Sequence, residues 1–121
     1  MTVAVWAGVV VIGGIGATLR FLLDRAIASR MARSFPFGTL AVNLSGALVL
    51  GLLSGLALNH TAALLAGTAL VGSYTTFSTW MLETQRLAEE RQVWPAVANI
   101  GVSLVLGIAA ALLGQAIAGH V

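Results

Sequence analysis

The sequence predicts an all-α membrane protein, and both its composition and the spacing of its apolar runs indicate this. Hydrophobic residues make up 59% of the 121 residues, charged residues make up 8%, and the mean hydropathy is +0.99. An average soluble domain carries roughly 25% charged residues. The apolar residues also fall into runs that are long enough to cross a bilayer, for which a helix needs about 20 residues.

Four apolar runs of this length are present, and they predict four membrane spans in a single domain covering residues 1–121. The predicted spans are 3–23, 37–58, 62–82 and 97–118. A short turn, "NHT", separates the second span from the third. Two longer polar stretches, "DRAIASRMARSF" and "ETQRLAEERQVWP", connect the other pairs.

Small residues are concentrated in three of the predicted spans. Lipid gives helices no hydrophobic reason to associate, so close backbone approach at small residues provides the packing energy instead. These residues predict a tightly packed bundle without indicating a function. The main ones are Gly13, Gly14, Gly16, Gly46, Gly51, Gly55, Gly101, Gly107 and Gly114.

The composition excludes several classes of function. The chain contains no cysteine, and its formal net charge of +2 gives no support for binding nucleic acid. Asp24 and Glu83 lie at span ends, and no acidic residue lies in the middle of a span. Proton-coupled exchange needs a titratable group inside the bundle. The sequence therefore argues against a small drug/proton antiporter, which has a similar length, and against a cation path lined by carboxylates.

Asn43 is an amide in an otherwise apolar span. Unpaired polar groups cost several kcal/mol in hydrocarbon, so those that persist face protein or a water-filled cavity. Thr39 lies four residues before Asn43 and therefore shares its helix face. Asn43 could join two helices through hydrogen bonds, or it could line a pathway for a polar solute. The spacing leaves both interpretations open.

The stretch "GSYTTFSTWMLE", residues 72–83, carries six hydroxyl groups within eight positions of the third span. Ser and Thr in membrane helices often donate to the carbonyl four residues earlier, which would hide some of them. Six exceed what one helix can hide in this way, and Gly72 weakens the helix further. We therefore predict a break in the third span, where exposed backbone groups line a cavity or bind an ion.

Two further features involve polar residues. A stripe of polar or small residues lies on the fourth span, at the four-residue spacing of Asn99, Ser103 and Gly107. This stripe could serve either close packing or a pathway. Arg20 follows "GGIGATL" near the end of the first span. It could extend to the membrane interface, or it could give a vestibule a positive potential that attracts anions.

Three motifs, "GGIGATLR", "FPFGTLAVNLSG" and "GSYTTFSTWMLE", resemble in order and spacing the signatures of the CrcB/Fluc family of fluoride channels. The resemblance extends over the whole chain through the four-span pattern. It implies a channel, not an enzyme. It also implies antiparallel dimers with two fluoride pathways between the subunits and a central sodium ion. A non-conducting assembly protein would explain the glycines but not the coincidence of Asn43 with "YTTFST".

The resemblance also assigns roles to individual residues. It implies that Asn43 is the pore asparagine and that Phe77 is the first aromatic residue of a pore box. The second box position, usually Phe, is Trp80 here, which keeps a positive ring edge and adds an N–H donor. The remaining implied roles are pore hydroxyls from Thr79 and Ser103, a vestibule arginine at Arg20, and sodium-binding backbone carbonyls from Gly72 and Thr75. The stripe beside Ser103 also differs from the family pattern, in Asn99 and Gly107.

Arginine is distributed unevenly between the two sides of the predicted topology. Loops one and three share a side, whereas the termini and the "NHT" turn carry no Lys or Arg. Basic residues in short loops favour the cytoplasmic side. We therefore expect loops one and three to be cytoplasmic in the cell's inner (plasma) membrane. An antiparallel dimer would then need either a homologous subunit of opposite orientation or a homodimer with dual insertion. The residues in question are Arg25, Arg30, Arg33, Arg86 and Arg91.

Overall fold

The computed structural model describes residues 2–30 and 35–120, and within these residues it contains helices and no strands. The predicted all-α class is therefore confirmed for the described residues. The elements in chain order are α1 (Val3–Arg30), α2 (Phe37–Gly55), α3 (His60–Ala63), the π-helix η1 (Leu64–Val71), α4 (Gly72–Tyr74), α5 (Ser78–Glu89) and α6 (Val93–Ala118).

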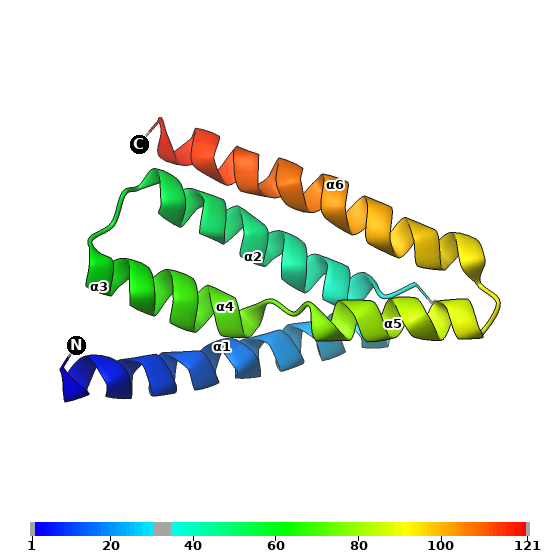
Figure 1. The fold of residues 1–121 in the computed structure, drawn as a ribbon, viewed down its shortest axis with the longest axis horizontal. Helices are drawn as coiled ribbons and strands as arrows, with labels where there is room; N and C mark the ends of the chain where they lie inside the picture. The colour runs from blue at the N-terminus through cyan, green and yellow to red at the C-terminus, as the bar shows by residue number, and fades with distance from the viewer. Residues whose placement is uncertain (1, 31–34, 121) are drawn as a thin grey trace.

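The chain runs back and forth along the long axis of the molecule (Figure 1). Helix α1 runs in one direction, α2 returns, the composite segment from α3 to α5 runs out again, and α6 returns. Both termini lie at the end where α2 turns into α3 (Figure 1). Three of the described helices, α1, α2 and α6, are long and apolar enough to cross a membrane. The composite segment is interrupted, so none of its pieces has that length.

The first connection differs from the sequence prediction. Helix α1 continues to Arg30, seven residues beyond the predicted end at residue 23. The extension contains Asp24 and Arg25 but otherwise consists largely of good helix formers, so polarity alone does not end the helix. Arg33 belongs to the predicted connection but lies outside the described residues.

The second connection begins earlier than predicted, and the last connection is shorter than predicted. Helix α2 ends at Gly55, three residues before the predicted limit, and Ala57 has a φ of 52° in the turn that follows. The Asn59 side chain then caps α3 by accepting from the Ala62 N–H at 2.8 Å. The last connection consists of residues 90–92, in which Arg91 has a φ of 62°. Left-handed residues of this kind commonly reverse the chain at helix ends.

Glycines bring α2 and α6 into close contact. A methyl group built at Gly51 would overlap the backbone of Ala111, and one at Gly114 would overlap the backbone of Leu48. A side chain on either glycine would therefore push the two helices apart. In contrast, Gly14, Gly101 and Gly107 have no atoms from other parts of the described chain within 4 Å of such a methyl position. The packing prediction is confirmed at Gly51 and Gly114 and is wrong for these three within the single subunit.

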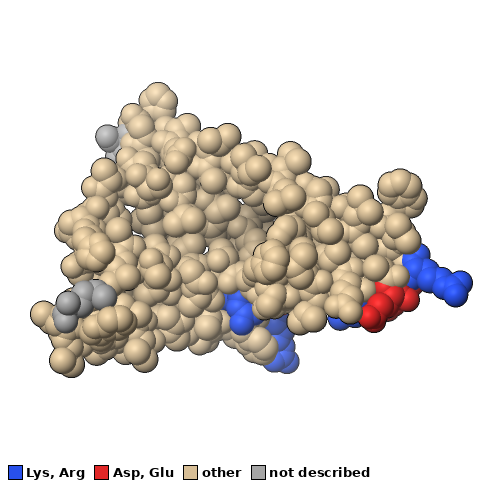
Figure 2. Space-filling view, in the orientation of Figure 1, with Lys and Arg blue, Asp and Glu red and all other residues tan. Residues whose placement is uncertain are grey.

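Helix α1 packs against the composite third segment. A methyl group at Gly16 would overlap the Ser73 hydroxyl and lie 2.5 Å from the Leu70 carbonyl oxygen. The outer surface of the bundle is strongly apolar, with Val10, Val105 and many other aliphatic side chains more than half exposed. On the face drawn in Figure 2, the charged side chains lie towards the lower edge and the right-hand end, and the rest is uncharged. This distribution suits a chain surrounded by lipid.

Candidate functional site

The third segment is broken between Tyr74 and Ser78, so the predicted break is confirmed. Thr75 has an extended conformation with φ −80° and ψ 160°, and a regular helix resumes only at Ser78. Gly72 itself is helical, with φ −61° and ψ −40°. The break therefore lies within the hydroxyl-rich stretch from which it was predicted, three residues beyond Gly72. The preceding π-helix η1 already departs from regular helix geometry, which is frequent at functional sites.

The side chain of Asn43 pairs with the backbone at the break. Its Nδ2 donates to the Thr76 carbonyl at 2.9 Å, and its Oδ1 accepts from the Thr76 N–H at 2.8 Å. The break leaves the N–H and the carbonyl of Thr76 without helical partners, and the Asn43 carboxamide provides a hydrogen-bond partner for each. Because Nδ2 has two hydrogens, one N–H of Asn43 is still available to a ligand.

Most hydroxyls of the 72–83 stretch have partners within the protein. Ser73 and Thr75 donate to carbonyls four residues earlier, at 2.7 and 3.1 Å. Tyr74 pairs with Ser45 of α2 at 2.7 Å, and the Thr76 hydroxyl accepts from the Thr79 N–H at 3.2 Å. Only two of these four hydroxyls are hidden by bonds to the preceding turn of their own helix, which agrees with the prediction that one helix cannot hide all six in this way. The four hydroxyls stabilise the two sides of the break.

A groove of about 330 Å³ lies beside the break. It brings together five of the residues to which the sequence assigned a role, and Gly46 of α2 forms part of its wall, where a methyl group would overlap the Thr75 side chain. The groove is therefore shaped by close approach of α2 to the break. The predicted site residues in its lining are Asn43, Gly72, Thr75, Phe77 and Trp80.

Two aromatic residues belong to the groove lining. Phe77 and Trp80 are arranged edge to face, with ring centroids 5.7 Å apart and an interplanar angle of 82°. Phe77 is 70% exposed, whereas Trp80 is half-buried. Aromatic rings have a positive edge, so a pair at right angles can present edge hydrogens to an anion.

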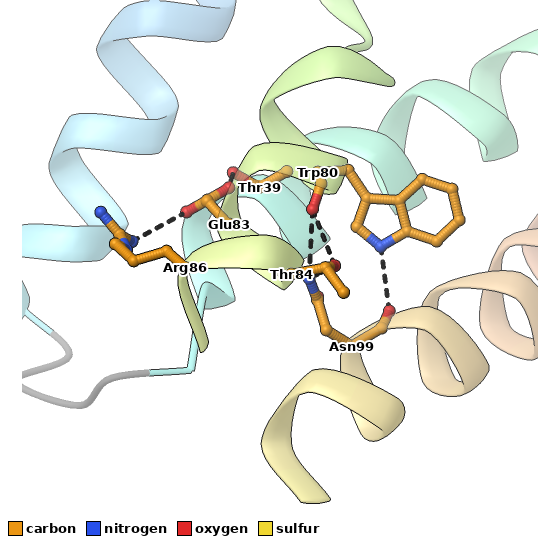
Figure 3. A network of polar contacts seen from close by, with 6 residues as sticks. All are labelled: Thr39, Trp80, Glu83, Thr84, Arg86 and Asn99. Atoms are coloured by element: carbon orange, nitrogen blue, oxygen red, sulfur yellow. Dashed lines mark hydrogen bonds and ion pairs between the residues drawn. The ribbon is translucent and has the colours of Figure 1, made fainter. Parts of the chain in front are cut away.

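The indole N–H of Trp80 is not directed at the groove. It donates to the backbone carbonyl of Asn99 at 3.0 Å (Figure 3). The Asn99 side chain in turn donates to the Thr84 hydroxyl at 2.8 Å and to the Trp80 carbonyl at 3.4 Å. The expectation that Trp80 offers an N–H donor to the pathway is therefore wrong. Asn99, which is only 1% exposed, faces α5 and not a pathway.

The remaining predicted residues lie outside the groove lining. Thr39 is 2% exposed and donates to Glu83 at 2.5 Å, and Glu83 also lies 3.9 Å from the Arg86 guanidinium (Figure 3). Arg20, on α1, is half-buried. Thr79, on α5, and Ser103, on α6, are also half-buried. Within one subunit, these four residues do not line the groove with Asn43.

Sequence reasoning missed three contributors to this region: the backbone of Thr76, the Thr84 hydroxyl and the close approach at Gly46. Thr84 follows Trp80 by four residues, a spacing that places both on one helix face. This spacing can be read from the sequence, but Asn99, the partner of Thr84, is fifteen residues away on another helix. The pairing could be found only once α5 and α6 were placed together.

The region suits a cation that prefers carbonyl oxygens. In an uninterrupted helix the Gly72 carbonyl would accept from the Thr76 N–H, but that N–H donates to Asn43 instead. Gly72 is exposed and belongs to the groove lining. Thr75 is extended, so its carbonyl does not follow the helix direction. Carbonyl oxygens suit hard cations such as sodium.

A broken helix beside a groove lined by a neutral amide and aromatic rings is typical of membrane proteins that move ions or small solutes. Residues 7–115 match the family model described as CrcB-like protein, Camphor Resistance (CrcB), and the chain belongs to this family.

Named relatives cover nearly the whole chain. It is 69% identical over 118 residues to "Fluoride-specific ion channel FluC 2" of Mycobacterium tuberculosis, covering 98% of this chain and 94% of the relative. A protein of the same name from Mycolicibacterium paratuberculosis is 68% identical over 117 residues, covering 97% and 96%. "Fluoride-specific ion channel FluC 1" of Thermobifida fusca is 46% identical over 104 residues, covering 86% and 87%.

Proposed function

We propose that this protein is a fluoride-specific ion channel that lets fluoride leave the cytoplasm passively. The observation that carries the proposal is the groove at the helix break, where Asn43, Phe77 and Trp80 meet. The printed names of the relatives, fluoride-specific ion channels at up to 69% identity, support the same conclusion.

The chemistry of the groove suits a small, strongly hydrated anion. Such an ion must exchange its water for hydrogen-bond donors, and the second Nδ2 hydrogen of Asn43 is one. Phe77 adds the positive edge of its ring. Helix α5 begins at Ser78, so the positive end of its dipole lies at the break. All of these groups are neutral or carry partial charges. They bind an anion weakly enough for it to leave again, which conduction requires.

The complete pathway in this proposal lies between two subunits. The chain crosses the membrane four times as a single domain, with the composite α3–α5 segment as the third crossing. Phe77 is 70% exposed, and the groove lies open at the surface of the subunit. A second subunit in the antiparallel orientation closes the groove and brings in the remaining half of the pathway. Thr39, Thr79, Ser103 and Arg20 contribute to the approaches of this assembled pathway.

The proposal includes one sodium ion between the subunits. The carbonyls of Gly72 and Thr75 would hold it, because the break frees the Gly72 carbonyl from its helical donor. When bound, the ion would neutralise carbonyl dipoles that otherwise face each other across the dimer axis. Its role is structural.

The proposal places the protein in the plasma membrane, with loops one and three in the cytoplasm. The basic residues at that end include Arg25, Arg30, Arg86 and Arg91. The partner of opposite orientation is then a homologous subunit, or a second copy if the chain inserts both ways. The numerals 1 and 2 in the relatives' names are compatible with paired subunits.

Fluoride efflux from liposomes tests the proposal. Purified protein should release fluoride from loaded vesicles when a potassium ionophore removes the opposing voltage, and chloride should stay inside. The rate should not depend on a pH gradient, whereas a drug/proton antiporter would require one. Vesicles that contain the protein but release no fluoride would instead indicate a non-conducting assembly protein.

A further inference from the structure

Trp80 and Asn99 belong to a hydrogen-bond network that the proposed pathway does not require. Three of its hydrogen bonds join α5 to α6 at one level of the bundle (Figure 3). The fourth is internal to α5, where the Thr84 hydroxyl donates to the Trp80 carbonyl at 2.9 Å. Thr84 therefore donates to one member of the network and accepts from another.

The network is part-buried and includes one fully buried residue, so its bonds matter more than surface bonds. Asn99 is 1% exposed, and Leu87, one turn beyond Thr84 on α5, is also 1% exposed. Removing one partner of a buried hydrogen bond leaves the other unsatisfied, which destabilises the structure more than losing a bond at the surface. The relative position of α5 and α6 is therefore strongly specified at this level.

Trp80 belongs both to this network and to the groove lining. Its indole N–H donates to the Asn99 carbonyl, so it connects the groove to α6. The indole is large, and without this bond it could rotate into the open groove beside Phe77. A phenyl ring at the same position has no N–H and less bulk, so it does not need the anchor.

We infer that Asn99 is a positioning residue for Trp80: its side chain fixes α5 against α6, so that its own carbonyl anchors the indole and keeps the ring at right angles to Phe77. The effect on ion flux rests on the proposed function. The anchoring of the indole does not, and it can be measured separately.

The structural test observes the indole directly. Trp6 and Trp94 are 56% and 80% exposed, so replacing both by Phe leaves Trp80 as the single indole. In ¹⁵N-tryptophan NMR spectra of this protein, one indole N–H signal with the downfield proton shift of a hydrogen-bonded group is expected. Asn99→Leu, which keeps the branched shape of the side chain but removes its hydrogen-bonding groups, should move this signal upfield or split it. Thr84→Val removes the hydroxyl and should do the same, which keeps the test valid if Asn99→Leu does not fold.

The matched control is Thr18→Val. The Thr18 hydroxyl also donates to a carbonyl four residues earlier, at 2.8 Å, but it lies on α1 outside the network. This change should leave the indole signal in place. An unchanged signal in both Asn99→Leu and Thr84→Val would overturn the inference.

The functional test uses the predicted dependence on Trp80. Asn99→Leu should lose most of the fluoride efflux in the Trp80 protein and little of it in a Trp80→Phe protein. Equal losses in both backgrounds would mean that Asn99 acts on the pathway by another route, and the inference would fall. If the unmodified protein conducts no fluoride, the proposed function fails, while the NMR result still decides whether Asn99 positions the ring.

Discussion

The carboxamide of Asn43 binds both backbone groups of Thr76, with hydrogen bonds of 2.9 Å to the carbonyl and 2.8 Å from the N–H. Asn43 lies on α2 and Thr76 lies in the break of the third segment, 33 residues later. One side chain therefore replaces the helical partners that the break removes. The same contact fixes the position of the remaining Asn43 N–H in the groove, so the stability of the break and the proposed ion contact depend on one residue.

Replacing Asn43 by Asp should abolish fluoride efflux and destabilise the subunit. A carboxylate cannot donate, so it would face the Thr76 carbonyl oxygen with a second acceptor and would repel an anion. Losing this bond with its partner left unsatisfied should cost about 1–3 kcal/mol. Efflux from liposomes and thermal unfolding in detergent measure the two effects.

The matched control for this change is Asn59→Asp. Asn59 uses its Oδ1 to cap α3, and Asp retains that acceptor, so efflux and unfolding temperature should stay near the values of the unmodified protein. Normal efflux from the Asn43→Asp protein would remove Asn43 from the ion pathway.

The two aromatic residues of the groove should respond differently to substitution. Trp80→Phe should retain efflux, because a phenyl ring preserves the positive edge and the indole N–H is directed at Asn99, not at the groove. Phe77→Ile should lose most of the efflux, because an aliphatic side chain offers no such edge to an anion. Initial efflux rates at equal protein density measure both. The reverse pattern would show that Trp80, and not Phe77, is the ring that the ion passes.

Glycines at the α2–α6 contact should differ from those that face outward. Gly51→Ala introduces a methyl group that overlaps the Ala111 backbone, so the helices must separate and the unfolding temperature should fall by several degrees. Gly101→Ala meets no atom within 4 Å, so the unfolding temperature of the subunit should stay the same or rise slightly. Thermal unfolding of both variants checks this. A similar fall for both would indicate that Gly101 is packed against a second subunit.

The sequence predicted the broad plan of the fold because lipid imposes simple rules on length and composition. Runs of apolar residues located α1, α2 and α6, and the hydroxyl-rich stretch located a break. The break lies within that stretch, but the sequence did not indicate which residue is extended. The extended residue is Thr75, and the compensating bonds come from Asn43 on another helix. A local propensity cannot reveal where a distant side chain replaces the backbone partners.

The same limit applies to the candidate site. Asn43, Phe77 and Trp80 were identified from their motifs, and the structure brings them to one groove. Asn99 was placed in a polar stripe with Ser103 because spacing along one helix was the only information available. Its actual partners, Trp80 and Thr84, depend on how α5 and α6 are rotated against each other. Spacing identifies which residues share a face, but not what that face contacts.

The last prediction concerns the orientation of the chain in the cell. The arginines of loops one and three should hold that end in the cytoplasm, so a chain expressed alone should insert in one orientation.

The protein has no cysteine, so single cysteines at exposed positions report directly which side of the membrane they lie on. Thr61, near the start of α3, and Ser29, at the end of α1, are both exposed and lie at opposite ends of the bundle (Figure 1). Thr61 is preferable to Asn59, which caps α3. An impermeant thiol reagent applied to intact cells should label Thr61→Cys and leave Ser29→Cys unlabelled until the membrane is opened.

With a fixed orientation, an antiparallel dimer requires a homologous subunit with the opposite arginine distribution, and co-expression of that subunit should raise fluoride efflux. Equal labelling of both positions would show dual insertion and would favour a homodimer.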